Sequence, residues 1–226
     1  MEVIILAGGF GTRLRSVLPN VPKPMAPIGE KPFLQILLEK LSEEKVKKVI
    51  LSLHFMAGKI QDYFGSNFLG MEIECLVEKT PLGTGGAIRL CLENCKEEKV
   101  FVFNGDTYLD IDLKDLTRLW DQRQCPILVG RHVDDLSRYG ALEIKDGIVT
   151  GMSEKAGVGA GLINAGCYVL PRNIFDSFAS RKTFSFEKDF LQNNLKEKGF
   201  AFYEAEGSFI DIGIPEDYVR AQALLS

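Results

Sequence analysis

Short, continuously apolar runs alternate with amphipathic stretches over the first 130 residues of the chain. Residues 33–41 place apolar side chains at helical spacing behind Pro32, which is tolerated in a first helical turn, and helices are also expected at 57–65, 84–94 and 112–122. The apolar runs predict strands at residues 3–6, 49–53, 73–77, 100–103 and 127–129. This alternation is typical of an α/β, Rossmann-like fold, with a mostly parallel sheet covered by helices on both faces.

The pattern changes after Gly130 to shorter strand segments joined by turns that contain glycine. Strands are expected around 141–145, 148–152 and 162–170, and their spacing predicts a small antiparallel insertion. Helices are expected at 171–179, 185–197 and 215–225. No internal repeat, linker or low-complexity segment interrupts the chain, so the 226 residues are expected to form one domain, residues 1–226.

A glycine-rich segment follows the first expected strand directly. Gly8, Gly9 and Gly11 can adopt backbone conformations that let consecutive N–H groups converge on one anion, and Arg13 and Lys23 add positive charge. The segment is not a Walker loop, which ends in Gly-Lys-Ser/Thr, and it has Leu14 where a dinucleotide fingerprint needs a third small residue. We therefore interpret it as a polyphosphate-binding loop, the alternative being a simple chain reversal.

Two aspartates follow apolar segments and are candidates for a metal site. Asp106 comes after the run 100–103, at the edge of the sheet where ligands of α/β proteins bind, and Asp211 follows residues 208–210 in the same way. Each alone could be a turn-forming residue. Together they would repel an anionic substrate unless a cation lay between them, which favours Mg²⁺ bound by Asp106 and Asp211 with phosphate oxygens and water.

The composition and the absence of common catalytic motifs argue against several classes of function. A formal net charge of −4 argues against a nucleic-acid partner, and the absence of a long apolar run argues against a membrane span, so a cytoplasmic protein is expected. Five cysteines without a Cys-x-x-Cys pair are expected to be reduced thiols. The chain lacks a Gly-x-Ser-x-Gly elbow and a His-Glu-x-x-His motif. A nucleophile that is already an anion, such as a sugar 1-phosphate, needs neither, because catalysis then reduces to alignment and charge neutralisation.

The same segments resemble the sugar-1-phosphate nucleotidyltransferases, also called nucleoside-diphosphate-sugar pyrophosphorylases, over nearly the whole chain. The matching segments are residues 6–14 (LAGGFGTRL), 22–25 (PKPM), 78–87 (EKTPLGTGGA), 104–106 (NGD), 137–140 (SRYG), 154–155 (EK), 164–166 (NAG) and 211–213 (DIG). The resemblance implies that Arg13 and Lys23 neutralise the transferring and leaving phosphates as catalytic residues. It also implies that Asp106 and Asp211 hold Mg²⁺ as the cofactor.

The resemblance further implies which residues contact each substrate. Residues 82–86 resemble a base-binding loop, although Thr84 could instead serve as the N-cap of a helix entry. The implied nucleotide-binding residues are Leu6, Ala7, Gly8, Gly9, Gly11, Thr12, Glu78, Leu82, Gly83, Thr84 and Gly85. The implied sugar-phosphate-binding residues are Tyr139, Gly140, Glu154, Lys155, Asn164 and Gly166. Many relatives have proline after the Glu-Lys pair, where this chain has Ala156, so the loop shape and the sugar are open.

Within the family, the chain resembles most the D-glycero-α-D-manno-heptose 1-phosphate guanylyltransferases of surface-polysaccharide (capsule) synthesis. That resemblance includes residues 184–187 (FSFE). It implies an enzyme that uses GTP and a sugar 1-phosphate, with a homo-oligomeric state left open. The alternatives are a mannose-1-phosphate guanylyltransferase, a uridylyl- or thymidylyltransferase for another sugar 1-phosphate, and a non-catalytic regulatory relative.

Overall fold

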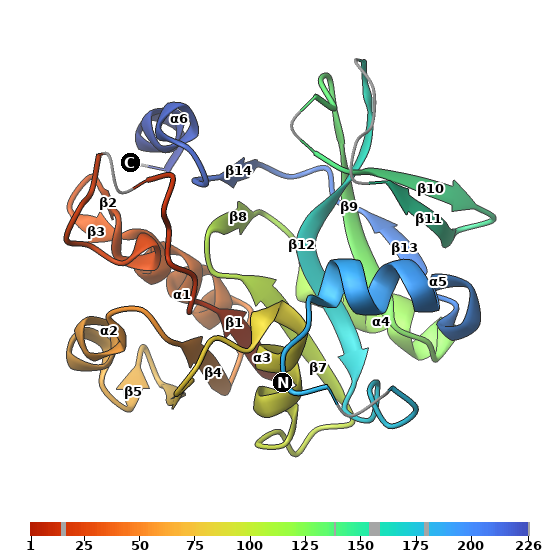
Figure 1. The fold of residues 1–226 in the computed structure, drawn as a ribbon, viewed down its shortest axis with the longest axis horizontal. Coiled ribbons are helices and arrows are strands. Elements are labelled where there is room, and N and C mark those ends of the chain that lie inside the picture. Colours follow the sequence, from red (N-terminus) through yellow and green to blue (C-terminus); the bar gives the residue numbers. More distant parts are fainter. Residues whose placement is uncertain (15–16, 138, 154–158, 179–180, 226) are drawn as a thin grey trace.

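A computed structural model describes residues 1–14, 17–137, 139–153, 159–178 and 181–225 and places one ten-stranded sheet through the molecule (Figure 1). Its N-terminal half is parallel. The strand β1 (Glu2–Leu6) lies between β4 (Lys48–Leu53) and β7 (Lys99–Asn104) and runs parallel to both, and β6 (Met71–Val77) adds parallel to β4. The short strand β5 (Asn67–Phe68) closes this edge in the antiparallel direction.

The other half of the sheet is mostly antiparallel. The long strand β12 (Gly161–Pro171) pairs antiparallel with β7 on one side and with β9 (Ile127–Val133) on the other. Next come β13 (Ala201–Glu204), parallel to β9, then β11 (Ile148–Ser153) and β10 (Ala141–Lys145). The predicted α/β class is confirmed, but the sheet is mixed rather than mostly parallel, because the antiparallel insertion continues the central sheet.

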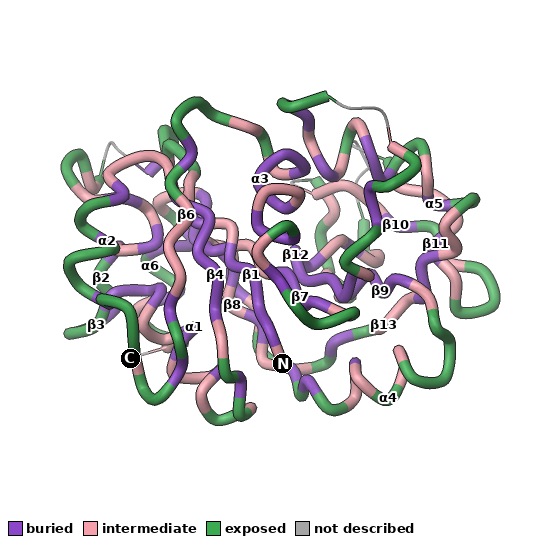
Figure 2. Tube along the Cα trace, turned by 90° about the horizontal axis from the view of Figure 1, so that it is seen from below, coloured by how far each residue is buried: buried purple, intermediate pink, exposed green. Residues whose placement is uncertain are grey.

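Helices cover both faces of the sheet, as the sequence predicts. One hydrophobic core lies under α1 (Phe33–Glu43), α2 (Ala57–Phe64), α4 (Leu113–Arg123) and α6 (Pro215–Leu225). The other lies under α3 (Gly83–Leu92), the π-helical turn η2 (Phe186–Leu191) and α5 (Gln192–Lys198). Strand β1 is buried on both faces, since Val3 and Ile5 join the first core and Ile4 the second, and Figure 2 shows the buried strands between the helices.

Small elements complete the fold around the carboxyl end of the parallel strands. The 3-10 helix η1 (Lys23–Met25) precedes a two-stranded ribbon of β2 (Pro27–Ile28) and β3 (Lys31–Pro32). A second ribbon pairs β8 (Thr107–Leu109) with β14 (Phe209–Asp211). Among the described residues, no helix has both the length and the apolar character needed to cross a membrane.

Several elements differ from the sequence-based expectation, since a predicted helix is missing and the short strands β2, β3, β5, β8 and β13 are not predicted. The helix expected at 171–179 is wrong over its described part. Pro171 ends β12, and Ile174, Asp176 and Phe178 donate N–H groups to carbonyls three residues earlier, which makes successive turns instead of a helix. The sequence does not predict strand β13, because Ala-Phe-Tyr-Glu is short and has no β-branched residue. It forms a strand because it pairs with β9 on one side and β11 on the other.

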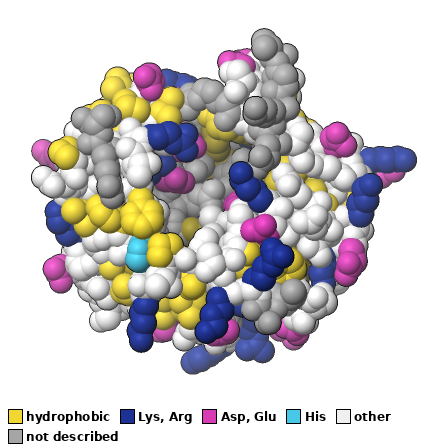
Figure 3. Space-filling model, in the orientation of Figure 1, with side chains coloured by type: hydrophobic (Ala, Val, Ile, Leu, Met, Phe, Trp, Pro, Cys, Tyr) yellow, Lys and Arg dark blue, Asp and Glu magenta, His cyan; other side chains and the backbone are white. Residues whose placement is uncertain are grey.

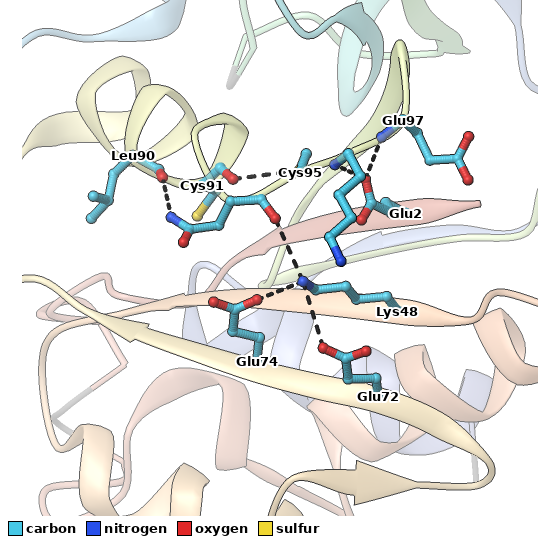
Figure 4. Close-up of polar contacts among 10 residues, drawn as sticks. Glu2, Lys48, Glu72, Glu74, Leu90, Cys91, Cys95 and Glu97 are labelled. Carbon is cyan, nitrogen blue, oxygen red and sulfur yellow. Dashed lines mark hydrogen bonds and ion pairs between the residues drawn. The ribbon is translucent and has the colours of Figure 1, made fainter.

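A polar layer at the opposite end of the strands ties the loop after α3 to the sheet (Figure 4). The buried Glu2 carboxylate accepts hydrogen bonds from the Lys96 and Glu97 amides at 2.6 and 2.8 Å. The Lys48 ammonium lies 2.6 Å from the Glu74 carboxylate. Burial raises the pKa of the nearby Cys95 thiol to about 12, and all five cysteines are free thiols, as predicted. This layer is structural and leaves the carboxyl ends of the strands for chemistry.

Candidate active site

The glycine loop and the Asp106 turn leave the sheet side by side. Leu6 and Asn104 are register partners at the ends of β1 and β7, and the Gly105 amide donates to the Leu6 carbonyl at 2.9 Å. A Cβ at Gly105 would lie 2.7 Å from that carbonyl oxygen, so only glycine fits this close approach. The adjacency of β1 and β7 therefore brings the glycine loop and the Asp106 turn together.

Asp106, Asp211 and Lys23 converge at this point although they are far apart in sequence. The Lys23 Nζ lies 2.6 Å from Asp106 Oδ2 and 3.6 Å from Asp211 Oδ1, and its side chain is 12% exposed. Strand β14 brings Asp211 opposite Thr107, and the Ile212 amide donates to the Asp106 carbonyl at 3.0 Å. Burial raises the pKa of Asp211, with Asp106 adding to the rise and Lys23 opposing it. The ammonium thus neutralises two carboxylates that would otherwise repel each other.

The glycine loop folds back over η1. Gly11 has a φ of +58°, and a Cβ placed on it would lie 3.1 Å from the Lys23 Cβ, so the loop passes close over the lysine. The Leu14 amide donates to the Gly11 carbonyl at 3.0 Å, and the buried Leu14 side chain fixes the end of the loop. Ala7 is buried in the core and Thr12 is exposed, while Arg13 lines a cavity described below.

A cavity of about 320 Å³ lies between the glycine loop and the 78–87 segment, on the face that is hollowed at its centre in Figure 3. Its lining includes the predicted nucleotide-binding residues Leu6, Gly8, Gly9, Glu78, Gly83 and Thr84 and the predicted metal ligand Asp106. Of the other lining residues, Phe10, Pro81, Ala87 and Asn104 lie in the segments that carry the resemblance but are given no role there, whereas Ser52 and His54 lie outside those segments. The phosphate loop and the base loop therefore face one cavity, which we call the first cavity.

His54 lies in the wall of the first cavity. Its Nδ1 lies 2.9 Å from the Glu78 carbonyl oxygen, and its ring meets the Phe10 ring edge-on with centroids 5.3 Å apart. A carbonyl oxygen only accepts hydrogen bonds, so Nδ1 carries a proton in this contact, and whenever the ring is neutral Nε2 is an acceptor.

The base loop is supported from two sides. The buried Glu78 carboxylate accepts from the Ser52 hydroxyl and from the Leu82 amide, both at 2.8 Å. On the other side, the Phe184 carbonyl accepts from the Gly85 amide and the Phe184 amide donates to the Leu82 carbonyl, both at 3.0 Å. Backbone groups of Leu82 and Gly85 that we expected to contact the base are thus occupied by the protein. The helix entry is correct, but Leu82 stands at the N-cap position and Thr84 lies within α3.

Replacing Gly85 by alanine is expected to destabilise the protein by about 1–3 kcal/mol, because a Cβ there would overlap the Phe184 ring. Phe184 is buried against Phe175 and Phe178, at centroid distances of 5.4 and 5.0 Å, so moving its ring would disturb this aromatic cluster. The control is Gly58→Ala in α2, where nothing lies within 4 Å of the added carbon and a small stabilisation is expected. Urea unfolding measures both; equal stability of the two variants would contradict this packing.

A second cavity, of about 550 Å³, has Arg13 of the glycine loop in its lining. Four of the residues that line it were predicted, namely Arg13, Tyr139, Gly140 and Asn164. Gly166 lies instead behind the wall, in a bulge of β12 with a φ of +69°, where a Cβ would clash with the Asn104 amide. Glu154, Lys155 and Ala156 lie outside the described residues, and their neighbour Ser153 lines this cavity.

The sequence reasoning missed the wall that η2 and α5 contribute to the second cavity. These residues are Ser185, Glu187, Lys188 and Gln192. The segment 184–187 carries part of the resemblance, and nothing in its local sequence shows that it packs against the base loop. The available signal was Ser185 before acidic Glu187 and Asp189, which marks a helix start but not a binding surface.

The chain matches the family model described as Nucleotidyl transferase over residues 2–226. It is 44% identical over 219 residues to the D-glycero-alpha-D-manno-heptose 1-phosphate guanylyltransferase of Campylobacter jejuni, covering 96% of this chain and 97% of that protein. For the protein of the same name from Aneurinibacillus thermoaerophilus, identity is 39% over 223 residues, covering 98% and 97%. The crystal structure of HddC from Yersinia pseudotuberculosis superposes with a TM-score of 0.90 at 39% identity, over 100% of this chain and 99% of that one. A structure of HddC complexed with GMP-PN gives a TM-score of 0.87.

Proposed function

Because the chain belongs to the nucleotidyl transferase family, we propose that it is a guanylyltransferase that transfers the GMP group of GTP to D-glycero-α-D-manno-heptose 1-phosphate. In this reaction a phosphate oxygen of the sugar 1-phosphate attacks the α-phosphorus of GTP. The bond between the α-phosphorus and the bridging oxygen breaks, and pyrophosphate leaves with the electron pair. The products are the GDP-linked heptose and pyrophosphate. The HddC complex with GMP-PN and the names of the two relatives support the choice of substrates.

The observation that carries the proposal is that the glycine loop contributes residues to the lining of both cavities. Gly8 and Gly9 line the first cavity and Arg13 lines the second, so the loop can hold the triphosphate while Arg13 faces the incoming sugar phosphate. Lys23 lies beneath the loop, close to Asp106 and Asp211. We assign Arg13 and Lys23 to neutralise charge on the transferring and leaving phosphates.

The remaining residues receive roles from the cavity they line. Gly83 and Thr84 face the nucleobase, and Glu78, Leu82 and Gly85 hold the base loop in place. Leu6, Ala7, Gly11 and Thr12 shape the phosphate loop. In the second cavity we assign the sugar phosphate to Tyr139, Gly140, Asn164 and, by the resemblance, Glu154 and Lys155, with Gly166 supporting Asn164.

The carboxylates of Asp106 and Asp211 suit Mg²⁺. Within the described residues, no group of three or more histidine, cysteine, aspartate or glutamate side chains could enclose a metal ion. Two carboxylates beside a phosphate loop match the preference of Mg²⁺ for a few carboxylates together with phosphate oxygens and water. When bound, the ion would neutralise charge on the phosphates and help to align them. The carboxylates hold their place through the Gly213 amide, at 2.6 Å from Asp211 Oδ1, and through Lys23.

A pyrophosphate-release assay with single nucleotides and sugar phosphates tests this function. We expect GTP to be preferred over ATP, CTP, UTP and dTTP by about tenfold or more, because the donor edge of guanine can pair with acceptors such as His54 Nε2. We also expect the heptose 1-phosphate to be preferred over mannose 1-phosphate. A preference for UTP or dTTP would reject guanylyl transfer, a preference for mannose 1-phosphate would reject the heptose, and no release with any pair would favour a regulatory relative.

We further propose that the 226 residues act as one nucleotidyltransferase domain in the supply of heptose for surface polysaccharide. The single sheet shared by residues 2–204 supports one domain.

A further inference from the structure

Glu187 lies between the two cavities and accepts hydrogen bonds from both sides. Its Oε2 accepts from the Thr84 hydroxyl at 2.6 Å and from the Ser185 hydroxyl at 3.0 Å. Its Oε1 lies 3.5 Å from the Tyr168 hydroxyl. Thr84 lines the first cavity, whereas Glu187 itself lines the second, so one carboxylate touches the base loop and the sugar cavity together.

The direction of each hydrogen bond in this network follows from its neighbours. The Phe186 amide donates to Thr84 Oγ1 at 2.8 Å, so the hydroxyl hydrogen of Thr84 is free to point at Glu187. On the sugar side, the Gly166 amide donates to Asn164 Oδ1 at 3.0 Å, which orients the Asn164 amide. The Asn164 Nδ2 then donates to the Tyr168 hydroxyl oxygen at 2.7 Å. The hydrogen of Tyr168 is left for Glu187, so the donors converge on this carboxylate.

Tyr168 lines neither cavity, but its hydroxyl is hydrogen-bonded both to Asn164 and to Glu187. The side chain is fully buried, and its ring packs edge-on against Phe186 at a centroid distance of 5.0 Å. Burial, with Glu187 adding to it, raises the pKa of Tyr168, so the hydroxyl stays a neutral donor. A buried polar group of this kind is costly unless it is paired, and its partners here are Asn164 and Glu187, the second of which also holds the base loop through Thr84.

We propose that Glu187 is a positioning residue that couples the nucleotide and sugar-phosphate sites through Thr84 and through Tyr168 and Asn164. The inference rests on the proposed function, because it takes the first cavity as the nucleotide site and the second as the sugar-phosphate site. A nucleotide that orders the base loop fixes Thr84, and Glu187 then holds Asn164 in the orientation that receives the sugar phosphate. Coupling between the two sites is reciprocal, so each substrate favours binding of the other.

Cross effects on the two Michaelis constants test this coupling. Thr84→Val removes a hydroxyl from the nucleotide wall, and we expect it to raise the KM for the sugar phosphate by about fivefold or more. Tyr168→Phe removes a hydroxyl that lines neither cavity, and we expect the KM of both substrates to rise. Glu187→Gln, which keeps the shape but offers only one acceptor oxygen, should match the double variant Thr84→Val/Tyr168→Phe, because all three changes break one network.

The matched control is Tyr203→Phe, which removes a hydroxyl bonded to the Asp115 carboxylate at 3.2 Å and should leave both KM values unchanged. Effects confined to the nucleotide in Thr84→Val, or additive effects of Thr84→Val and Tyr168→Phe, would overturn the coupling and leave Glu187 as a structural group. If Glu187→Gln fails to fold, Tyr168→Phe alone decides, since it removes a single oxygen. An inactive wild-type enzyme would reject the proposed function, whereas an active one without cross effects would reject the coupling alone.

Discussion

Replacing Asp106 or Asp211 by asparagine is expected to lower kcat by about a hundredfold or more with the fold intact. Asparagine keeps the shape of the side chain but removes the charge that Mg²⁺ and Lys23 need. The Asp106 and Asp211 carboxylates lie 2.6 and 3.6 Å from the Lys23 ammonium, so replacing either removes one negative charge beside this lysine. Steady-state pyrophosphate release at several Mg²⁺ concentrations measures the loss, and thermal unfolding confirms the fold.

The control for this pair is Asp110→Asn, close in sequence to Asp106 but paired with Lys40 at 2.8 Å and outside both cavities. It is expected to keep full turnover. Full activity of Asp106→Asn in the presence of a chelator would remove the metal assignment.

Replacing Lys23 by methionine is expected to reduce turnover on the same scale, because the charge that separates two carboxylates from the incoming phosphates would be lost. Methionine keeps much of the apolar length of the buried side chain, so the fold is expected to survive. Lys23 also opposes the raised pKa of Asp211, which must therefore rise further in the variant. In the metal-free protein, Asp211 is then expected to stay protonated up to a higher pH than in the wild type.

Steady-state kcat measures the first effect, and NMR titration of the Asp211 carboxyl in metal-free Lys23→Met and wild type measures the second. Lys31→Met is the control, because Lys31 is half exposed, pairs with Glu39 at 2.9 Å and lines neither cavity. An unchanged kcat in Lys23→Met, or a lower pKa of Asp211 in the metal-free variant, would contradict the role given to this lysine.

The sequence predicted the parts of the fold that depend on local burial. Runs such as 3–6 and 100–103 are apolar on both sides, and they do form strands buried on both faces. An apolar run does not show the direction of its neighbour, however, and the antiparallel placement of β12 beside β7 made the sheet mixed. Strand β13 and the turns after Pro171 depend in the same way on packing between distant segments.

In the candidate site too, the sequence indicated the residues that follow from strand order and missed those that depend on packing between distant segments. The convergence of Asp106 with the glycine loop followed from strand adjacency, because the ends of parallel strands meet at one edge. The contribution of Glu187 could not be seen, since it reaches Thr84 across 103 positions of the chain. The glycines of the base loop were recognised, but for Gly85 the close approach is to Phe184 and not to a ligand.

Isotope labelling of the attacking sugar phosphate tests the central claim most directly. Heptose 1-phosphate carrying ¹⁸O in the non-bridging oxygens of its phosphate is incubated with GTP, Mg²⁺ and the enzyme. The products are separated, and mass spectrometry measures the ¹⁸O content of each. Attack on the α-phosphorus predicts that all the label stays in the GDP-heptose, that pyrophosphate is unlabelled, and that the two products form in equal amounts. Label in pyrophosphate, or consumption of GTP to GMP or GDP without a nucleotide sugar, would contradict nucleotidyl transfer at this site.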